Sequence, residues 1–322
     1  LPGERDALMS WEPSYLALHR SGELRRRARA AMASLASCEL CPHRCRADRL
    51  AGKHGVCRAA AGPVIASWNI HPWEEPPISG THGSGTIFFS NCTGRCRFCQ
   101  NYSISQLGHG NEVTIERFAG MMLELQRRGA HNINFVTPTH FAAQILAAVD
   151  VAAGWGLRIP LVYNTSGYER VETLRLLEDV IDIYLPDIKY TGDEVARRLS
   201  GFGHYVEHNR AALREMFRQV GSSLQCDEQG IAQRGMIIRH LVLPEGLAGT
   251  PDAMRWIAAE LSPEVHVSIM DQYFPTYRTV DDPVLGRKIT EEEYEVALDA
   301  FEAAGLHNGW LQDHECDEET PA

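Results

Sequence analysis

The chain has 322 residues, of which 44% are hydrophobic and 23% are charged, and both fractions are ordinary for a globular protein. Its net charge of −11 argues against a broad basic face, so we expect no nucleic-acid partner. The sequence has no run of 18 apolar residues and no apolar leader at its start. We therefore expect no membrane span, no membrane partner and a cytoplasmic location.

Residues 1–61 are predicted to form a helical, cysteine-rich extension that binds metal. Alanines between residues 28 and 35 favour a helix, whereas the stretch from Cys38 to Cys57 has too few apolar side chains to build a core. A bound metal would have to supply the stability of that stretch. Residues 62–82 contain Pro72, Pro76 and Pro77, which disfavour helices and central strands, so we expect an ordered loop there.

Residues 62–280 are predicted to form one α/β domain, because short apolar runs alternate with helical segments from residue 84 onwards. The expected strands are 86–90, 132–136, 159–163, 181–185, 236–243 and 265–270. Strands that alternate with helices indicate a parallel sheet with right-handed crossovers. A full TIM barrel has eight such units, so six predict an open, partial (β/α)6 TIM-like barrel.

Capping residues mark the helices between and after these strands. Thr114 is expected to begin a helix that ends near Gly129, and Thr250 to begin another. Further helices are predicted over residues 141–153 and, in two pieces, within 193–220. Residues 281–322 are predicted to form a C-terminal helix, which begins with a capping box of Thr290 and Glu293, and an acidic tail.

Three cysteines, Cys92, Cys96 and Cys99, follow the first predicted barrel strand in the spacing C-x3-C-x2-C. An electron-transfer [4Fe–4S] cluster takes four cysteines, so three leave one iron free for another ligand, as catalytic metal sites do. A loop after a strand lies at the carboxyl end of a β/α barrel, where active sites form. The alternatives are a zinc knuckle completed by His109 and unligated core thiols.

The same motif, with an aromatic residue before its third cysteine, is typical of the radical S-adenosylmethionine (SAM) superfamily. From Cys38 to Tyr277 the chain also resembles the PflX-like branch, which is related to the pyruvate formate-lyase activating enzymes. Besides Cys38-x2-Cys41-Pro42, the stretches that carry the resemblance are 74–80, 83–90, 136–140, 163–168, 184–190 and 239–244.

This resemblance implies an enzyme that reductively cleaves SAM at a [4Fe–4S] cluster. The resulting 5′-deoxyadenosyl radical would abstract hydrogen from a protein or peptide, as in glycyl-radical activases. An electron donor such as flavodoxin or ferredoxin is then expected. The alternatives are a small-molecule substrate and, from another class, a non-enzymatic iron–sulfur or zinc protein.

Polar residues follow each predicted strand, and the resemblance assigns several of them to SAM. Activating enzymes bind the SAM amino group with a Gly-Gly-Glu stretch that this chain lacks, so the contact falls to Thr137 or Thr139. Asp187-x-Lys189 resembles their D-x-K element, in which the lysine would pair with the SAM carboxylate. The other expected contacts are Phe98, Asn101, Asn164, Thr165, Ser166, Arg239, His240 and Gln272.

Several of these expectations carry open alternatives, among them a surface ion pair for Asp187 and Lys189 and simple packing for Gln272. Asn164 stands where the activating enzymes have an acid, which puts a nearby cation site in doubt. His240 has the alternative of a satisfied core histidine. The sequence singles out no catalytic side chain beyond these cofactor contacts.

Four more cysteines, Cys38, Cys41, Cys45 and Cys57, lie in the extension. Four thiols are a complete set for a second Fe–S cluster or for zinc, and the spacing does not decide between the two metals. The alternatives are unligated thiols and a redox-active C-x2-C pair formed by Cys38 and Cys41.

Overall fold

The computed structural model describes residues 11–311. The predicted acidic tail lies outside this range, as does Cys316. Within the range, no helix is both long and apolar enough to cross a bilayer.

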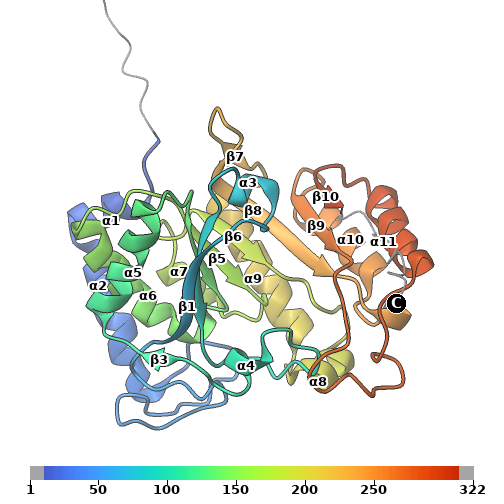
Figure 1. Ribbon diagram of the computed structural model, residues 1–322, viewed down its shortest axis with the longest axis horizontal. Coiled ribbons are helices and arrows are strands. Elements are labelled where there is room, and N and C mark those ends of the chain that lie inside the picture. Colours follow the sequence, from blue (N-terminus) through green and yellow to red (C-terminus); the bar gives the residue numbers. More distant parts are fainter. Residues whose placement is uncertain (1–10, 312–322) are drawn as a thin grey trace, which may run out of the picture.

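An open, mostly parallel sheet forms the centre of the molecule (Figure 1). Strands were found at all six predicted positions, and each pairs in parallel with its neighbours in the order β2-β4-β5-β6-β8-β9. Their bounds are β2 Ser84–Phe89, β4 Ile133–Val136, β5 Leu161–Thr165, β6 Ile183–Pro186, β8 Ala232–Leu241 and β9 His266–Met270. Most of their side chains are buried on both faces, as expected for a covered parallel sheet. The partial TIM-like barrel is confirmed, and the sheet does not close.

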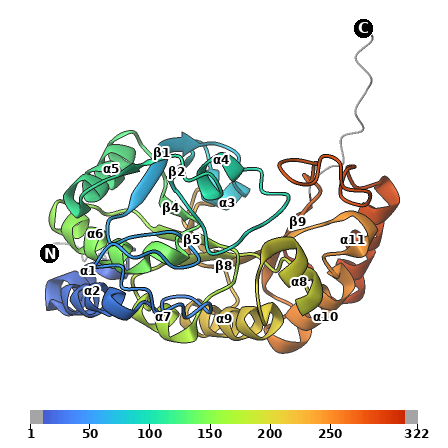
Figure 2. The ribbon, with the colours of Figure 1, turned by 90° about the horizontal axis from the view of Figure 1, so that it is seen from below.

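Helices cover the outer side of this curved sheet (Figure 2). The N-cap of α5 is Thr114, whose side chain accepts a hydrogen bond from the Arg117 N–H, and α11 begins with the predicted capping box of Thr290 and Glu293. The helices are α1 Tyr15–Ser21, α2 Glu23–Ala33, α4 Tyr102–Ser105, α5 Ile115–Arg127, α6 Ala142–Gly154, α7 Val171–Leu176, α8 Asp193–Ser200, α9 Tyr205–Val220, α10 Thr250–Glu260 and α11 Glu291–Ala303.

The expected loop at residues 62–82 is instead a strand followed by a short helix. Strand β1 (Val64–His71) pairs antiparallel with β2 and with β3 (Asn111–Glu112). Pro63 and Pro72 flank β1 without entering it, and Pro76 begins α3 (Pro76–Ser79), where a missing N–H costs nothing. The prolines therefore lie at the ends of these elements and do not prevent them from forming.

Two short strands near the C-terminal side were not predicted. Strand β10 (Gly309–Leu311) follows α11 and pairs in parallel with β9, which makes α11 a crossover helix. Strand β7 (Gln225–Cys226) forms a hairpin with β8. Both are too short to carry a hydrophobic period.

The N-terminal extension packs on the amino-terminal half of the barrel. Helices α1 and α2 lie on α6, where His19 and Arg25 bind Asp150 at 2.7 and 3.0 Å. Residues 38–63 contain no helix or strand. Side chains of the α7 region hold this segment, because Thr173 donates to the Leu40 carbonyl and Arg170 to the Glu39 carbonyl.

Candidate active site

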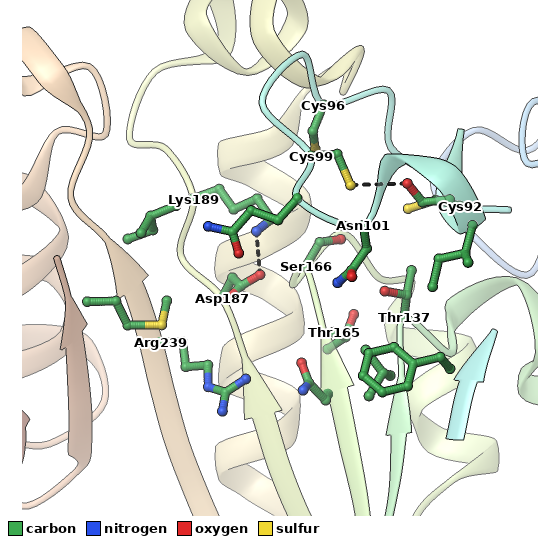
Figure 3. Close-up of a pocket in the computed structure, with 18 of the residues that line it drawn as sticks. Cys92, Cys96, Cys99, Asn101, Thr137, Thr165, Ser166, Asp187, Lys189 and Arg239 are labelled. Carbon is green, nitrogen blue, oxygen red and sulfur yellow. Dashed lines mark hydrogen bonds and ion pairs between the residues drawn. The ribbon is translucent and has the colours of Figure 1, made fainter. Parts of the chain in front are cut away.

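A cavity of about 460 Å³ lies at the carboxyl ends of the parallel strands. Residues that follow β2, β4, β5 and β6 line it together with side chains at the ends of β8 and β9. In Figure 3 the three cysteines lie at one end of this cavity and Arg239 at the other, with Asp187 and Lys189 between them. The strand ends thus build one pocket.

Cys92, Cys96 and Cys99 all line the cavity, and each sulfur has its own hydrogen-bond partner. Cys92 Sγ accepts from the Gly94 N–H at 3.2 Å, and Cys96 Sγ accepts from the Ser200 hydroxyl at 3.0 Å. The Ser105 hydroxyl lies 3.0 Å from Cys99 Sγ. Among residues 11–311, no three Cys, His, Asp or Glu side chains are grouped to hold a single ion. Three thiols spread around one cavity suit a multi-iron cluster, in which each thiolate binds a different iron.

Burial determines the protonation of the Cys92 and Cys96 thiols. It raises the pKa of Cys92 to about 12 and also raises the pKa of Cys96, although the Lys189 ammonium partly opposes the shift at Cys96. The buried thiols are therefore neutral until a metal displaces their protons.

The backbone of the three-cysteine loop is fixed by contacts with α8. The N–H groups of Arg95 and Arg97 donate to the carbonyls of Ser200 and Leu199. The φ of Gly94 is not positive, so a tight turn does not require this glycine. A Cβ at this position would instead lie 2.7 Å from the Phe202 ring, so the glycine is needed for close packing.

Ten of the twelve predicted SAM contacts line the cavity. The other two, Thr139 and His240, do not. Thr139 is buried and donates to Glu169 at 2.5 Å. His240 is fully buried, with Nδ1 2.7 Å from the Ile188 carbonyl and Nε2 2.8 Å from the Thr250 hydroxyl. Burial lowers the pKa of His240 to about 4, so its ring is neutral. With both ring nitrogens hydrogen-bonded, it matches the alternative interpretation of a histidine that belongs to the core.

Lys189 and Asp187 form an ion pair at 2.5 Å inside the cavity. Burial opposes the charge of Lys189, but the Asp187 carboxylate outweighs this effect, so the pKa of Lys189 lies above its usual value. Lys189 therefore stays charged at physiological pH and offers a cation to an anionic ligand group.

At the opposite end of the cavity, Arg239 is held by two carboxylates that were not predicted as site residues. Its guanidinium donates to Glu75 at 2.6 and 2.7 Å and also to Glu74. Glu74, His71 and Trp73 line the cavity as well, and Trp73 is 82% exposed. A buried arginine needs a counterion, and two adjacent acids in a predicted loop were a signal that could have found these residues.

The four cysteines of the extension are close enough to affect one another electrostatically. Cys38, Cys41 and Cys57 are buried, whereas Cys45 is exposed. Burial raises the pKa of Cys41 and of Cys57, and the Cys38 thiol adds to both shifts. The segment lies against the three-cysteine loop, because His43 Nε2 is 2.8 Å from the Thr93 carbonyl oxygen.

Residues 86–223 match the family model of the radical SAM superfamily. An uncharacterized protein of Methanocaldococcus jannaschii, MJ0674, is 30% identical over 282 residues, which cover 84% of this chain and 75% of that protein.

Solved structures give weaker matches, each at 14% identity. HydG, a maturase of the [FeFe]-hydrogenase, superposes with a TM-score of 0.48 over 73% of this chain and 53% of its own. HydG from Carboxydothermus hydrogenoformans gives 0.48 over 69% and 51%. Methylornithine synthase (PylB) gives 0.45 over 68% and 62%. The chain thus spans about half the length of the HydG proteins.

Proposed function

The chain belongs to the radical SAM superfamily, and we propose that its cavity holds a [4Fe–4S] cluster through Cys92, Cys96 and Cys99, with SAM against the strand ends. Membership implies an enzyme with both cofactors. When bound, the cluster supplies the electron that cleaves SAM to a 5′-deoxyadenosyl radical, which abstracts hydrogen from a substrate. The observation that carries the proposal is that the thiols of Cys92, Cys96 and Cys99 and a charged lysine all line one cavity.

The donor set fits the proposed cluster. Three sulfurs face the cavity, and each is already hydrogen-bonded by Gly94, Ser105 or Ser200. Such outer contacts orient the ligands and set the properties of a bound metal group. Three protein thiolates leave room for one ligand that the protein does not supply.

The remaining cavity residues divide the binding of SAM among themselves. Lys189 is proposed to bind the SAM carboxylate, with Asp187 keeping it charged and in place. Arg239 stays paired with Glu74 and Glu75 and shapes the far wall. The other proposed contacts are Phe98, Asn101, Thr137, Asn164, Thr165, Ser166 and Gln272.

We propose a protein or peptide substrate, as for the glycyl-radical activases. Trp73 lines the cavity and is exposed, so the cavity is open to solvent on that side and a large substrate has access to it. The substrate would then approach from outside, beside the exposed Trp73. A small-molecule substrate is the alternative. The PflX-like branch, a flavodoxin- or ferredoxin-type donor and the cytoplasmic location stay predictions.

A second metal site is proposed at Cys38, Cys41, Cys45 and Cys57. Three of the four thiols are buried in a segment without regular structure, where metal binding would supply stability that packing does not. The metal is either zinc or the iron of a second Fe–S cluster, and because these thiols are not grouped around a single ion in residues 11–311, binding would have to draw them together.

The first experiment counts iron, sulfide and zinc in the anaerobically reconstituted protein and in a Cys92→Ala/Cys96→Ala/Cys99→Ala variant. The variant should lose about four irons and all dithionite-dependent 5′-deoxyadenosine formation. About four remaining irons would assign an Fe–S cluster to the extension, and zinc alone would assign a structural clip. A wild type that binds no iron overturns the proposal.

The second experiment addresses the substrate. The reduced enzyme and SAM are incubated with a glycyl-radical enzyme that carries a C-terminal glycine loop, and the EPR spectrum is recorded. A glycyl-radical signal supports the activase reading. Stimulation of 5′-deoxyadenosine formation only by a dialysable fraction would favour the small-molecule alternative.

A further inference from the structure

The cysteine segment of the extension lies directly behind the three-cysteine loop. His43, between Cys41 and Cys45, contacts the Thr93 carbonyl, between Cys92 and Cys96. Arg58 Nη1, next to Cys57, donates to the Gln106 carbonyl at 3.0 Å. The two cysteine sets thus share an interface made of hydrogen bonds.

A second connection runs through Arg49. Its Nη1 lies 3.6 Å from Cys38 Sγ and donates to the His140 carbonyl at 2.7 Å. The His140 ring in turn lies 2.9 Å from the carbonyl of Ser90, two residues before Cys92. Both cysteine sets are therefore tied to the backbone at the end of β2.

Arg95 stands at the centre of this interface. Its guanidinium donates to the carbonyls of Cys92 at 3.1 Å and Gly94 at 3.2 Å, and also to the carbonyl of Val56 in the extension. One guanidinium therefore contacts the backbone of both cysteine segments.

We propose that Arg95 is a positioning residue that couples the four-cysteine segment to the SAM cluster. The proposal rests on the function proposed above. Held by Val56, beside Cys57, the guanidinium stays next to Cys92. A fixed positive charge beside a cluster ligand favours the reduced, more negative cluster, so Arg95 raises its reduction potential.

The coupling follows from what holds Arg95 in place. Val56 precedes Cys57, in a segment with little apolar packing, and metal binding at Cys57 would fix the Val56 carbonyl. If that segment loses its metal, Arg95 loses one anchor, and its effect at Cys92 weakens. The extension then acts on radical initiation without touching the substrate.

The test is an EPR-monitored redox titration of the SAM cluster, with iron counted in every sample. Arg95→Met should move the midpoint potential to a more negative value while the loop keeps about four irons. Arg97→Met is the matched control, because Arg97 lies in the same loop but contacts Arg278 and Asp282 instead. Its midpoint should equal that of the wild type. Equal midpoints for Arg95→Met and Arg97→Met would overturn the proposal.

A double-mutant cycle tests the coupling itself. In a Cys41→Ala/Cys57→Ala background, the shift caused by Arg95→Met should fall to less than about half of its size in the wild type. A shift of the same size in both backgrounds overturns the coupling. If the background variant does not fold, the midpoint potential of Arg95→Lys is compared with those of the wild type and Arg95→Met. A midpoint between the two supports a positioning role, because lysine keeps the charge but lacks the planar fork. A midpoint equal to that of the wild type overturns the positioning role.

The wild-type iron count separates this proposal from the one on which it rests. A wild type without iron overturns both. A loaded wild type with a midpoint insensitive to Arg95 overturns only the coupling.

Discussion

The imidazole of His43 lies 2.8 Å from the backbone carbonyl oxygen of Thr93, across fifty residues of sequence. Each of these residues stands between two cysteines of its own set. Burial lowers the pKa of His43, so its ring is neutral and donates to the carbonyl through Nε2. The extension is therefore part of the wall behind the candidate active site rather than a separate appendage.

The packing of Gly94 against Phe202 gives the first prediction. Gly94→Ala would place a Cβ 2.7 Å from a fully buried ring, so the loop or the ring must move. We expect a loss of about 1–3 kcal/mol in unfolding free energy and a lower iron content after reconstitution. Urea unfolding and iron analysis measure the two effects.

Gly203→Ala is the control for this change, because a Cβ added at Gly203 would have no atom within 4 Å and the φ of this residue is not positive. It should leave both readouts unchanged. Phe202→Leu in the Gly94→Ala background should restore part of the iron content. A Gly94→Ala protein that matches the wild type in both readouts would contradict the packing argument.

The second prediction concerns the buried charges of Arg239, Glu74 and Glu75. Arg239→Met leaves the carboxylates of Glu74 and Glu75 without their cation, and we expect a loss of about 3–5 kcal/mol in stability. Thermal or urea unfolding measures it.

The surface pair Arg214–Glu260, with about half of each side chain exposed, is the matched comparison. Arg214→Met should change the unfolding free energy by no more than about 1 kcal/mol. Adding Glu74→Gln and Glu75→Gln to Arg239→Met should recover much of the loss. Equal losses for Arg239→Met and Arg214→Met would show that the buried pairing is unimportant.

Periodic apolar runs and capping residues were sufficient to predict the barrel. Strands such as Ile133–Val136 are buried on both faces, and Thr114 and Thr290 cap their helices as expected. Strand β1 was not predicted because the prolines on both sides of it indicated a loop. Strand β10 was not predicted because three residues are too few to show an alternation of apolar and polar side chains. The positions of short and proline-flanked strands depend on pairing with distant strands, which local sequence does not encode.

The candidate site was predictable where a motif names its residues, as at Cys92, Cys96 and Cys99. It was less so for residues carried over by position. Thr139 follows β4 and His240 lies in β8, but neither side chain lines the cavity. Thr139 forms a hydrogen bond with Glu169 instead, and His240 forms one with Thr250. The contacts of Arg95 with Val56 and of Arg239 with Glu74 join distant segments, and only the folded chain reveals them.

The third prediction tests the role of Lys189. Lys189→Met removes the charged donor from the cavity, and we expect SAM affinity to fall by about 10- to 100-fold, the range for a lost charge-assisted hydrogen bond. Calorimetric titration of the reconstituted protein with SAM measures it. Iron content should stay unchanged, because no cysteine hydrogen bond involves this side chain in residues 11–311. Unaltered affinity would remove Lys189 from the SAM site.

The last prediction is a pH dependence of stability that arises at Asp182, far from the cysteines. Asp182 is fully buried and accepts hydrogen bonds from the N–H groups of Ser14 and Leu161, both at 3.0 Å. Burial raises its pKa to about 7, although Arg234 partly opposes the shift. The folded chain therefore holds this proton at pH values where the unfolded chain has lost it.

Because the folded state binds more protons between the unfolded and folded pKa values, stability falls as the pH rises from about 4 to about 7. Asp182→Asn cannot ionise, so its unfolding free energy should lack this decline. We expect the wild type to lose on the order of 2 kcal/mol relative to the variant between about pH 5 and pH 8. Urea unfolding of both proteins across this range measures the difference between their unfolding free energies. Groups that titrate in both proteins, such as Glu169, contribute equally to both and do not affect this difference. A constant difference would mean that Asp182 ionises normally in the folded protein.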